Sequence, residues 1–145
     1  MKVREILQQK ASDIRTVKRS EKVVAAMEQL ISHKISCLPV VEAGKLIGII
    51  SDKDIFKAVY ENQGGFTNFT VGDLMTEDLI VGVEDDEIEY ISNIITNNKI
   101  RHIPIVDEDK LVGLISIGDV VKATEKHIKA ENRYLKQYID GSYPG

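Results

Sequence analysis

Apolar residues of this chain fall into short blocks with two different spacings. Residues 23–31 (VVAAMEQLI) have apolar side chains at helical spacing, and residues 88–96 (IEYISNIIT) repeat the pattern. Asp86 and Glu89 have the spacing of a capping box at the second of these helices. Two short apolar runs around a polar turn follow each helix, LPVV and LIGIIS around EAGK, then IPIV and LVGLIS around DEDK. The pattern predicts an amphipathic helix followed by a β-hairpin, twice.

The second half of the chain repeats the first. Residues 34–58 align with residues 99–123 without a gap, at a constant shift of 65, and twelve of the 25 positions are identical. Self-similarity of this kind indicates an internal duplication. We expect one unit over residues 1–63, a flexible Gly-containing linker over 64–70, and a second unit over 71–145.

A serine and an aspartate three residues apart open the helix after each hairpin. They are Ser51 and Asp54 in the first copy and Ser116 and Asp119 in the second. This spacing is that of a capping box, in which the serine accepts from the backbone of the aspartate. The second of these helices is longer, and the pattern predicts that it runs over residues 118–139.

Each copy therefore has a proline in its second strand, a glycine in its third, and G-I-I-S-x-x-D or G-L-I-S-x-x-D leading into a helix. This pattern resembles a tandem pair of cystathionine-β-synthase (CBS) domains, also called a Bateman module, over nearly the whole chain. The resemblance implies an α+β fold in which two tandem βαββα repeats pack by pseudo-twofold symmetry. It also implies a regulatory protein, not an enzyme, with two clefts built from both repeats. Such clefts commonly bind AMP, ADP or ATP, and sometimes NAD or S-adenosylmethionine.

The resemblance assigns the repeated motif to the two clefts. It implies that Asp54 in one cleft and Asp119 in the other receive the ribose hydroxyls of the nucleotide, and a carboxylate can accept both. Ser51 and Ser116 match the family's phosphate-contacting position. A capping role alone is the competing interpretation, and the two roles are compatible.

Basic residues precede the hairpin of the second copy only. Arg101 and His102 occupy a stretch where nucleotide-binding relatives place phosphate contacts, and Ser36 and Cys37 stand there in the first copy. Because an arginine offers a planar fork to phosphate, we predict that the Asp119 cleft is the principal site. The alternative is that Arg101 points to solvent and His102 packs under the sheet.

The opening strand of each repeat is expected, from the same resemblance, to line the adenine pocket of the other. This implies Thr16 and Val17 for one cleft and Val81 and Gly82 for its mate, mostly through backbone hydrogen bonds to the base. Ser36 is a further candidate there.

The charge and the few cysteines and histidines of the chain argue against several other classes of function. The net charge of -4 argues against nucleic acid as a partner, and a single cysteine excludes an internal disulfide and a thiolate metal site. No apolar run approaches the length of a membrane span, so we expect a cytoplasmic protein without a membrane partner. Three histidines and one cysteine form no recognisable catalytic arrangement.

The favoured hypothesis is a nucleotide sensor that acts through contacts with a second copy or with an unknown target protein. AMP is favoured among its ligands, because two basic residues match one phosphate better than three. In the last predicted helix Val121, Ile128 and Leu135 recur every seven residues, which indicates either a seam for another chain or a helix folded back on its own module. The competing hypotheses are a ligand-free oligomerisation scaffold and a redox regulator that uses Cys37.

Overall fold

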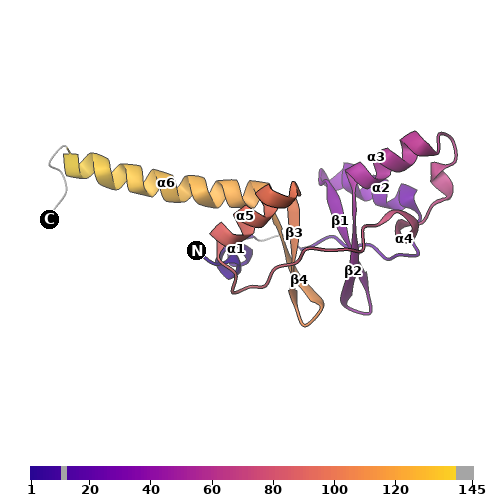
Figure 1. Ribbon diagram of the computed structural model, residues 1–145, viewed down its shortest axis with the longest axis horizontal. Helices are drawn as coiled ribbons and strands as arrows, with labels where there is room; N and C mark the ends of the chain where they lie inside the picture. The colour runs from indigo at the N-terminus through magenta and orange to yellow at the C-terminus, as the bar shows by residue number, and fades with distance from the viewer. Residues whose placement is uncertain (11–12, 140–145) are drawn as a thin grey trace.

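The computed structural model describes residues 1–10 and 13–139 and confirms the two repeated units (Figure 1). Each unit consists of a helix, a β-hairpin and a second helix, preceded by a short helix. In chain order the elements are α1 (Val3–Gln9), α2 (Val23–His33), β1 (Cys37–Glu42), β2 (Lys45–Ser51), α3 (Asp52–Glu61), the 3-10 helix η1 (Phe66–Asn68), α4 (Val71–Leu74), α5 (Ile88–Asn98), β3 (His102–Asp107), β4 (Lys110–Ser116) and α6 (Ile117–Ile139).

The two hairpins join into one four-stranded sheet of order β1-β2-β4-β3. Within the hairpins the registers are equivalent, with Cys37 opposite Ser51 and His102 opposite Ser116. The hairpins meet through β2 and β4 with a single residue pair, Lys45 and Lys110. Since those two residues are themselves equivalent in the repeat, the pairing is pseudo-twofold symmetric, as the resemblance implied.

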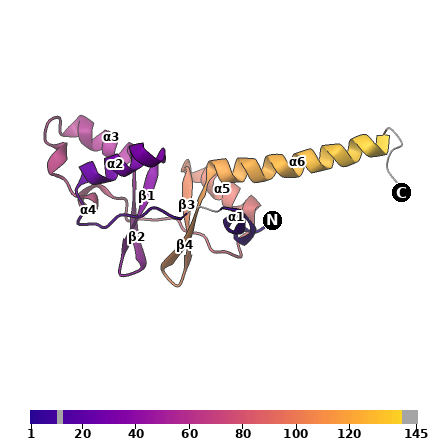
Figure 2. The ribbon, with the colours of Figure 1, turned by 180° about the vertical axis from the view of Figure 1, so that it is seen from behind.

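The hydrophobic cores do not follow the sequence repeats. Val71 and Met75, from α4 and its end, are buried in the core of the first repeat, whereas Val3 and Ile6 of α1 are buried in the core of the second. Figure 2 shows the same exchange, with α1 beside α5 and α4 beside α2. The domain boundaries predicted from the sequence stay a prediction. Each hydrophobic core, however, is completed by the short helix that opens the other repeat.

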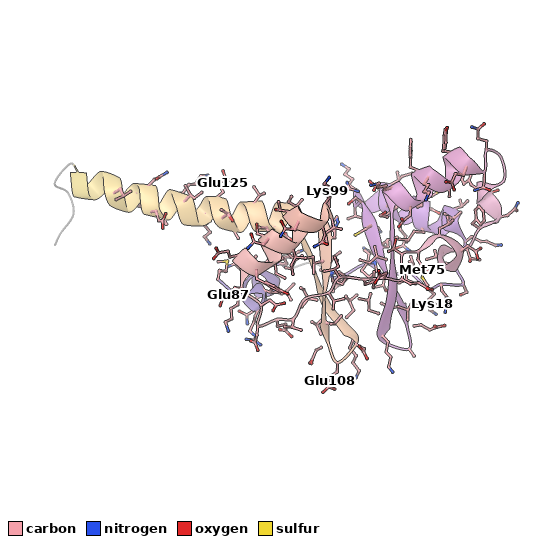
Figure 3. The ribbon with its side chains drawn as sticks, viewed as in Figure 1. Lys18, Met75, Glu87, Lys99, Glu108 and Glu125 are labelled. Carbon is pink, nitrogen blue, oxygen red and sulfur yellow. The ribbon has the colours of Figure 1, made fainter. Side chains whose placement is uncertain are left out.

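Two equivalent glycines allow the opening helices to approach the sheet. A Cβ atom on Gly48 would lie 2.8 Å from Met75 Sδ and 3.0 Å from the carbonyl oxygen of Thr76. A Cβ atom on Gly113 would lie 2.6 Å from a methyl carbon of Leu7. Figure 3 shows Met75 next to β2. The repeated glycine of the third predicted strand is therefore explained by close packing.

Both predicted capping boxes of the S-x-x-D motif are present. Ser51 Oγ accepts from the Asp54 backbone, and Ser116 Oγ accepts from the Asp119 backbone, at 3.2 and 3.0 Å. The capping box predicted at Asp86 is wrong, because α5 begins one residue later, with Glu87 at the N-cap. The Asp86 carboxylate instead accepts the backbone N–H of Val83.

The predicted linker is packed against the first repeat. Phe66 and Phe69 lie against its core, and the backbone N–H of Val23 donates to the Phe69 carbonyl. Two partly buried aromatic side chains thus attach the segment to the first repeat, and its flexibility stays a prediction. The predicted stop after residue 139 lies outside the described residues.

Helix α6 continues past the end of α5, away from the sheet (Figure 1). The apolar residues of the predicted seam, Val121, Ile128 and Leu135, are all about half exposed. The helix is therefore not folded back on its own module along the part that the structure describes, and the seam for another chain stays a prediction.

Candidate functional site

The structure has two clefts, each lined by residues of both repeats. The first, the Asp54 cleft, has a volume of about 340 Å³, and the second, the Asp119 cleft, about 520 Å³. Both volumes fall in the range of small-molecule sites. The Asp54 cleft is lined by Cys37, Ile49, Ser51, Lys53, Asp54, Thr76, Asp78, Leu79, Ile80, Asn98, Lys99, Ile100, Arg101, His102 and Pro104. The Asp119 cleft is lined by Leu7, Lys10, Asp13, Ile14, Arg15, His33, Ile35, Cys37, His102, Val112, Gly113, Leu114 and Ser116.

The Asp54 carboxylate is held at the start of α3 and faces its cleft. Its Oδ2 accepts the backbone N–H of Ser51 at 3.0 Å, and its Oδ1 accepts the Thr76 hydroxyl at 3.4 Å. The latter bond is long, so this oxygen retains capacity for another donor. Since α3 begins beside it, backbone N–H groups of the first helical turn lie near the same end of the cleft.

Asp119 is not among the residues that line the second cleft, but Ser116 and Lys10, which bond to its carboxylate, both line it. Its Oδ2 accepts the Ser116 backbone N–H and the Lys10 ammonium, both at 2.8 Å. Burial acts to raise the pKa of Asp119, but the hydrogen bonds from Lys10 and Ser116 together outweigh it and hold the pKa below its usual value. The carboxylate is therefore ionised and already has a cationic partner.

Arg101 lies in the other cleft from the one predicted. Its backbone is next to the Asp119 helix, because its carbonyl accepts the N–H of Ile117 at 2.8 Å. Its side chain crosses to the first repeat, lines the Asp54 cleft and contacts Asp52 at 2.6 Å. The prediction that Arg101 lines the Asp119 cleft is wrong. Its side chain is long enough to reach Asp52 of the first repeat, and the ion pair with Asp52 holds it in the Asp54 cleft.

His102 and Cys37 line both clefts and so form a wall common to the two. Burial, and then the nearby Arg101 and Lys10, lower the pKa of His102, so its imidazole is neutral at pH 7. Burial raises the pKa of Cys37 to about 12. The wall therefore offers a neutral imidazole and a thiol, not an added positive charge.

The backbone of the opening strands is already in use. In each opening strand one residue pairs with the first strand of its own hairpin, Val17 with β1 and Gly82 with β3. Val17 donates to Pro39 and accepts from Val41, and Gly82 bonds in the same way to Pro104 and Val106. The N–H groups of Val17 and Gly82 are therefore already bonded, and a base could use only the second lone pair of each carbonyl, so their role stays a prediction.

Residues just before these pairs line the clefts instead, Ile14 and Arg15 in the Asp119 cleft and Leu79 and Ile80 in the Asp54 cleft. Each opening segment thus reaches the cleft of the other repeat, as the resemblance implied. Three other predicted residues, Thr16, Ser36 and Val81, do not line either cleft. The Ser36 carbonyl accepts the N–H of Asp52.

Sequence reasoning missed Lys10, Thr76, Asp78 and Lys99. The first three come from the segments that follow α1 and α4. The residues of these two helices, VREIL (3–7) and VGDLM (71–75), align at a shift of 68. Extending that alignment places Lys10 opposite Asp78. The repeat thus contained a signal for two equivalent cleft positions of opposite charge.

Among the described residues, no three or more His, Cys, Asp or Glu side chains come together as a metal site. The helices of the same residues include none with a stretch long and apolar enough to cross a membrane.

Two equivalent units that meet in one sheet, with two clefts lined by residues of both, define a pseudo-twofold pair of domains. The sequence model of the CBS domain matches residues 3–61 and 71–126, so the chain belongs to the CBS domain family and contains two copies of that domain. It is 32% identical over 126 residues to the mitochondrial CBS domain-containing protein CBSX3 of Arabidopsis thaliana, which covers 83% of this chain. The chain spans 61% of the length of that relative.

Solved structures of similar sequence have the same fold. The AMP complex of CBSX2 is 30% identical, with a TM-score of 0.75 over 86% of this chain and 96% of that one. The CBS domain pair of MJ0100, in complex with 5-methylthioadenosine and S-adenosyl-L-methionine, is 28% identical. Its TM-score is 0.77 over 88% of this chain and 98% of that one. The α+β fold of two packed repeats is therefore confirmed.

Proposed function

We propose that this chain is a regulatory module, not an enzyme, that binds an adenine nucleotide and passes its occupancy to a partner. One observation carries the proposal: two equivalent helix-capping aspartates, Asp54 and Asp119, adjoin two clefts of ligand size, each lined by the opening segment of the other repeat. Similar domain pairs bind AMP or adenosyl ligands, which supports the same ligand class here. AMP is the favoured member.

In this proposal the ribose hydroxyls donate to the capping carboxylates. The phosphate lies near Ser51 or Ser116, where the first N–H groups of α3 and α6 carry partial positive charge. In the Asp54 cleft the phosphate is offered Arg101, which is paired with Asp52, and in the Asp119 cleft it is offered Lys10, which is paired with Asp119 itself. Lys53 and Lys99 also line the Asp54 cleft, and Arg15 also lines the Asp119 cleft. AMP is favoured because a similar domain pair binds it, not because of the number of cations.

A thermal-shift panel tests the proposal. AMP, ADP, ATP, NAD and S-adenosylmethionine are each added to wild type, Asp54→Ala and Asp119→Ala, and shifts are measured from each variant's own ligand-free midpoint. A ligand at about 100 times its dissociation constant adds roughly 2.7 kcal/mol, which is several degrees for a chain of this size. We expect AMP to raise the wild-type midpoint and the aspartate variants to lose part or all of the shift.

Asp73→Ala is the matched control. Asp73 forms a capping box with Thr70 at α4, and neither residue lines a cleft. A variant that loses a cap but no cleft group keeps the full ligand shift. If no nucleotide shifts the wild type, or if Asp73→Ala loses the response as strongly as the others, the nucleotide proposal is wrong.

Exposed apolar side chains support a second copy of the chain as the partner. Ile31 of α2 and Phe56 and Tyr60 of α3 are each about three-quarters exposed, which is unusual for large apolar residues on a lone domain. We expect a homodimer by sedimentation equilibrium and dissociation in Phe56→Glu. The same surface favours a ligand-free scaffold, which predicts dimers and no nucleotide shift.

A further inference from the structure

The carboxylate assigned to ribose in the Asp119 cleft is occupied by a side chain of the protein. Lys10 Nζ lies 2.8 Å from Asp119 Oδ2 and 2.8 Å from the carbonyl oxygen of Leu114. The lysine and aspartate side chains are 32% and 20% exposed, so the pair is partly shielded from water. An ion pair in this setting is stronger than an exposed one.

Lys10 occupies a place that backbone holds in the other repeat. Leu114 is equivalent to Ile49, whose N–H and C=O both bond to the backbone of Thr76 at 3.0 and 2.8 Å. In the second repeat the Leu114 carbonyl accepts the Lys10 ammonium. A fixed backbone bridge is thus replaced by the end of a flexible side chain, which can leave without unfolding a strand.

The backbone of Lys10 stays anchored whichever way its side chain turns. Its N–H caps α1 by donating to the Ile6 carbonyl at 3.0 Å, and Leu7 packs over Gly113 of β4. The ammonium therefore moves on a short tether inside the cleft. It remains available to any group that enters.

A ligand whose ribose hydroxyls donate to Asp119 competes with the Lys10 ammonium for the Oδ2 oxygen of that carboxylate. If Lys10 is displaced, its charge loses a partner in a partly buried place, and that loss weakens binding. A ligand with a phosphate supplies a new partner for the ammonium. Neutral adenosine supplies none, and the sulfonium of S-adenosylmethionine repels it.

We propose that Lys10 makes the Asp119 cleft selective for adenosine ligands with an anionic 5′ group and against neutral or cationic ones. The inference rests on the proposed function and adds the residue that sets specificity in one of its clefts. The Asp54 cleft has Asp78 at the aligned position, and the Asp54 carboxylate accepts from Ser51 and Thr76, so a ribose there does not compete with a lysine for the carboxylate.

The test isolates the Asp119 cleft in an Asp54→Ala background and measures AMP and adenosine by titration calorimetry. Lys10→Met, which keeps the length of the side chain and removes its charge, is expected to weaken AMP, strengthen adenosine and lower the AMP-to-adenosine affinity ratio about tenfold or more. Lys10→Arg is expected to retain a preference for AMP. Lys57→Met, at an exposed lysine of α3 that lines neither cleft, is the control that leaves the ratio unchanged.

The two proposals fail in different ways. An unchanged ratio in Lys10→Met, or loss of all binding in the Asp54→Ala background while wild type still binds AMP, overturns the role of Lys10 alone. Absence of binding in wild type overturns the nucleotide proposal itself. If Lys10→Met lowers the ligand-free midpoint strongly, Lys10→Gln, which can still donate to the Leu114 carbonyl, replaces it with the same expected ratio.

Discussion

The two clefts differ in which acid holds a cation that reaches over from the other repeat. In the Asp54 cleft that acid is Asp52, and in the Asp119 cleft it is the capping aspartate itself. Arg101 pairs with Asp52 across the two repeats, whereas the equivalent positions, Ser36 and Ile117, cannot form an ion pair. Lys10 pairs directly with the capping carboxylate Asp119. A duplicated unit thus retains its backbone in both copies while a few side chains give the two clefts different chemistry.

The two carboxylates therefore differ in how much hydrogen-bonding capacity is left for a ligand. Asp54 has one oxygen with only a long bond to Thr76, and its neighbouring arginine is held by another acid. Asp119 has one oxygen taken twice, by Ser116 and Lys10. We therefore expect the Asp54 cleft to accept ribose readily and the Asp119 cleft to require a ligand that also satisfies Lys10.

The largest expected effect concerns Cys37, the counterpart of His102 in the common wall. With its pKa raised from 9.0 to about 12, the thiolate fraction falls roughly a thousandfold, and Cys37 is only 5% exposed. Labelling by a thiol reagent at pH 8 is expected to be at least about a hundredfold slower in the native protein than in urea. Native labelling as fast as in urea would favour the redox hypothesis.

Alanine at the equivalent glycines distinguishes how firmly each opening helix is held. Gly48→Ala is expected to lower the free energy of unfolding by about 2 kcal/mol, because the Thr76 carbonyl at 3.0 Å is backbone and cannot turn away. Gly113→Ala meets only the end of the Leu7 side chain, so its loss is expected to be about 1 kcal/mol or less. Urea unfolding of both variants measures the difference, and equal losses would mean that the two approaches are equally rigid.

Acid unfolding compares the two carboxylates. The folded pKa of Asp119 lies below its usual value near 3.8, so its contribution to stability is present above that value and is lost as the pH falls through the folded pKa. Asp119→Asn is expected to lose about 1 kcal/mol at pH 7 and to show a shallower decline of stability below pH 4. Asp54→Asn is the matched variant. Because the Asp54 carboxylate accepts from Ser51 and Thr76 and not from a lysine, its loss of stability at pH 7 is expected to be smaller. The reverse order would contradict the strength assigned to the Lys10 pair.

The smallest expected effect lies at the hairpin turns. Ala43 and Glu108 both have positive φ, 51° and 49°, at the first turn position of their hairpins, and Figure 3 shows Glu108 at the hairpin tip. Asparagine adopts this conformation more easily, so Ala43→Asn and Glu108→Asn are each expected to add about 0.5 kcal/mol to stability. Thermal unfolding of the two variants checks whether the hairpins gain equally.

Local patterns in the sequence predicted most of the fold. Helical spacing located α2 and α5, paired apolar runs located both hairpins, and S-x-x-D located the starts of α3 and α6 to within one residue. These features depend on interactions between residues a few positions apart, so the sequence displays them directly. The capping box predicted at Asp86 is wrong because the helix begins one residue later and the Asp86 carboxylate accepts the N–H of Val83, which precedes the helix.

The site was only partly predictable. Ser51 and Asp54 line one cleft. Ser116 lines the other, whereas Asp119 bonds to lining residues without lining the cleft itself. Arg101 was assigned to the wrong cleft because a side chain can reach across a pseudo-twofold contact that no local spacing reports. The backbone N–H groups of Val17 and Gly82 already donate to the first strand of each hairpin, and this long-range pairing has no signal in the local sequence.

The sequence by itself determined that the chain contains two copies of one unit, each with a hairpin and a capped helix, because duplication and capping depend on residue order and short-range hydrogen bonds. Only the tertiary structure decided which opening helix completes which core and which cation reaches which carboxylate. Those choices rest on contacts between residues distant in the chain, such as Leu7 against Gly113 and Lys10 against Asp119. Their geometry follows from how the two hairpins meet.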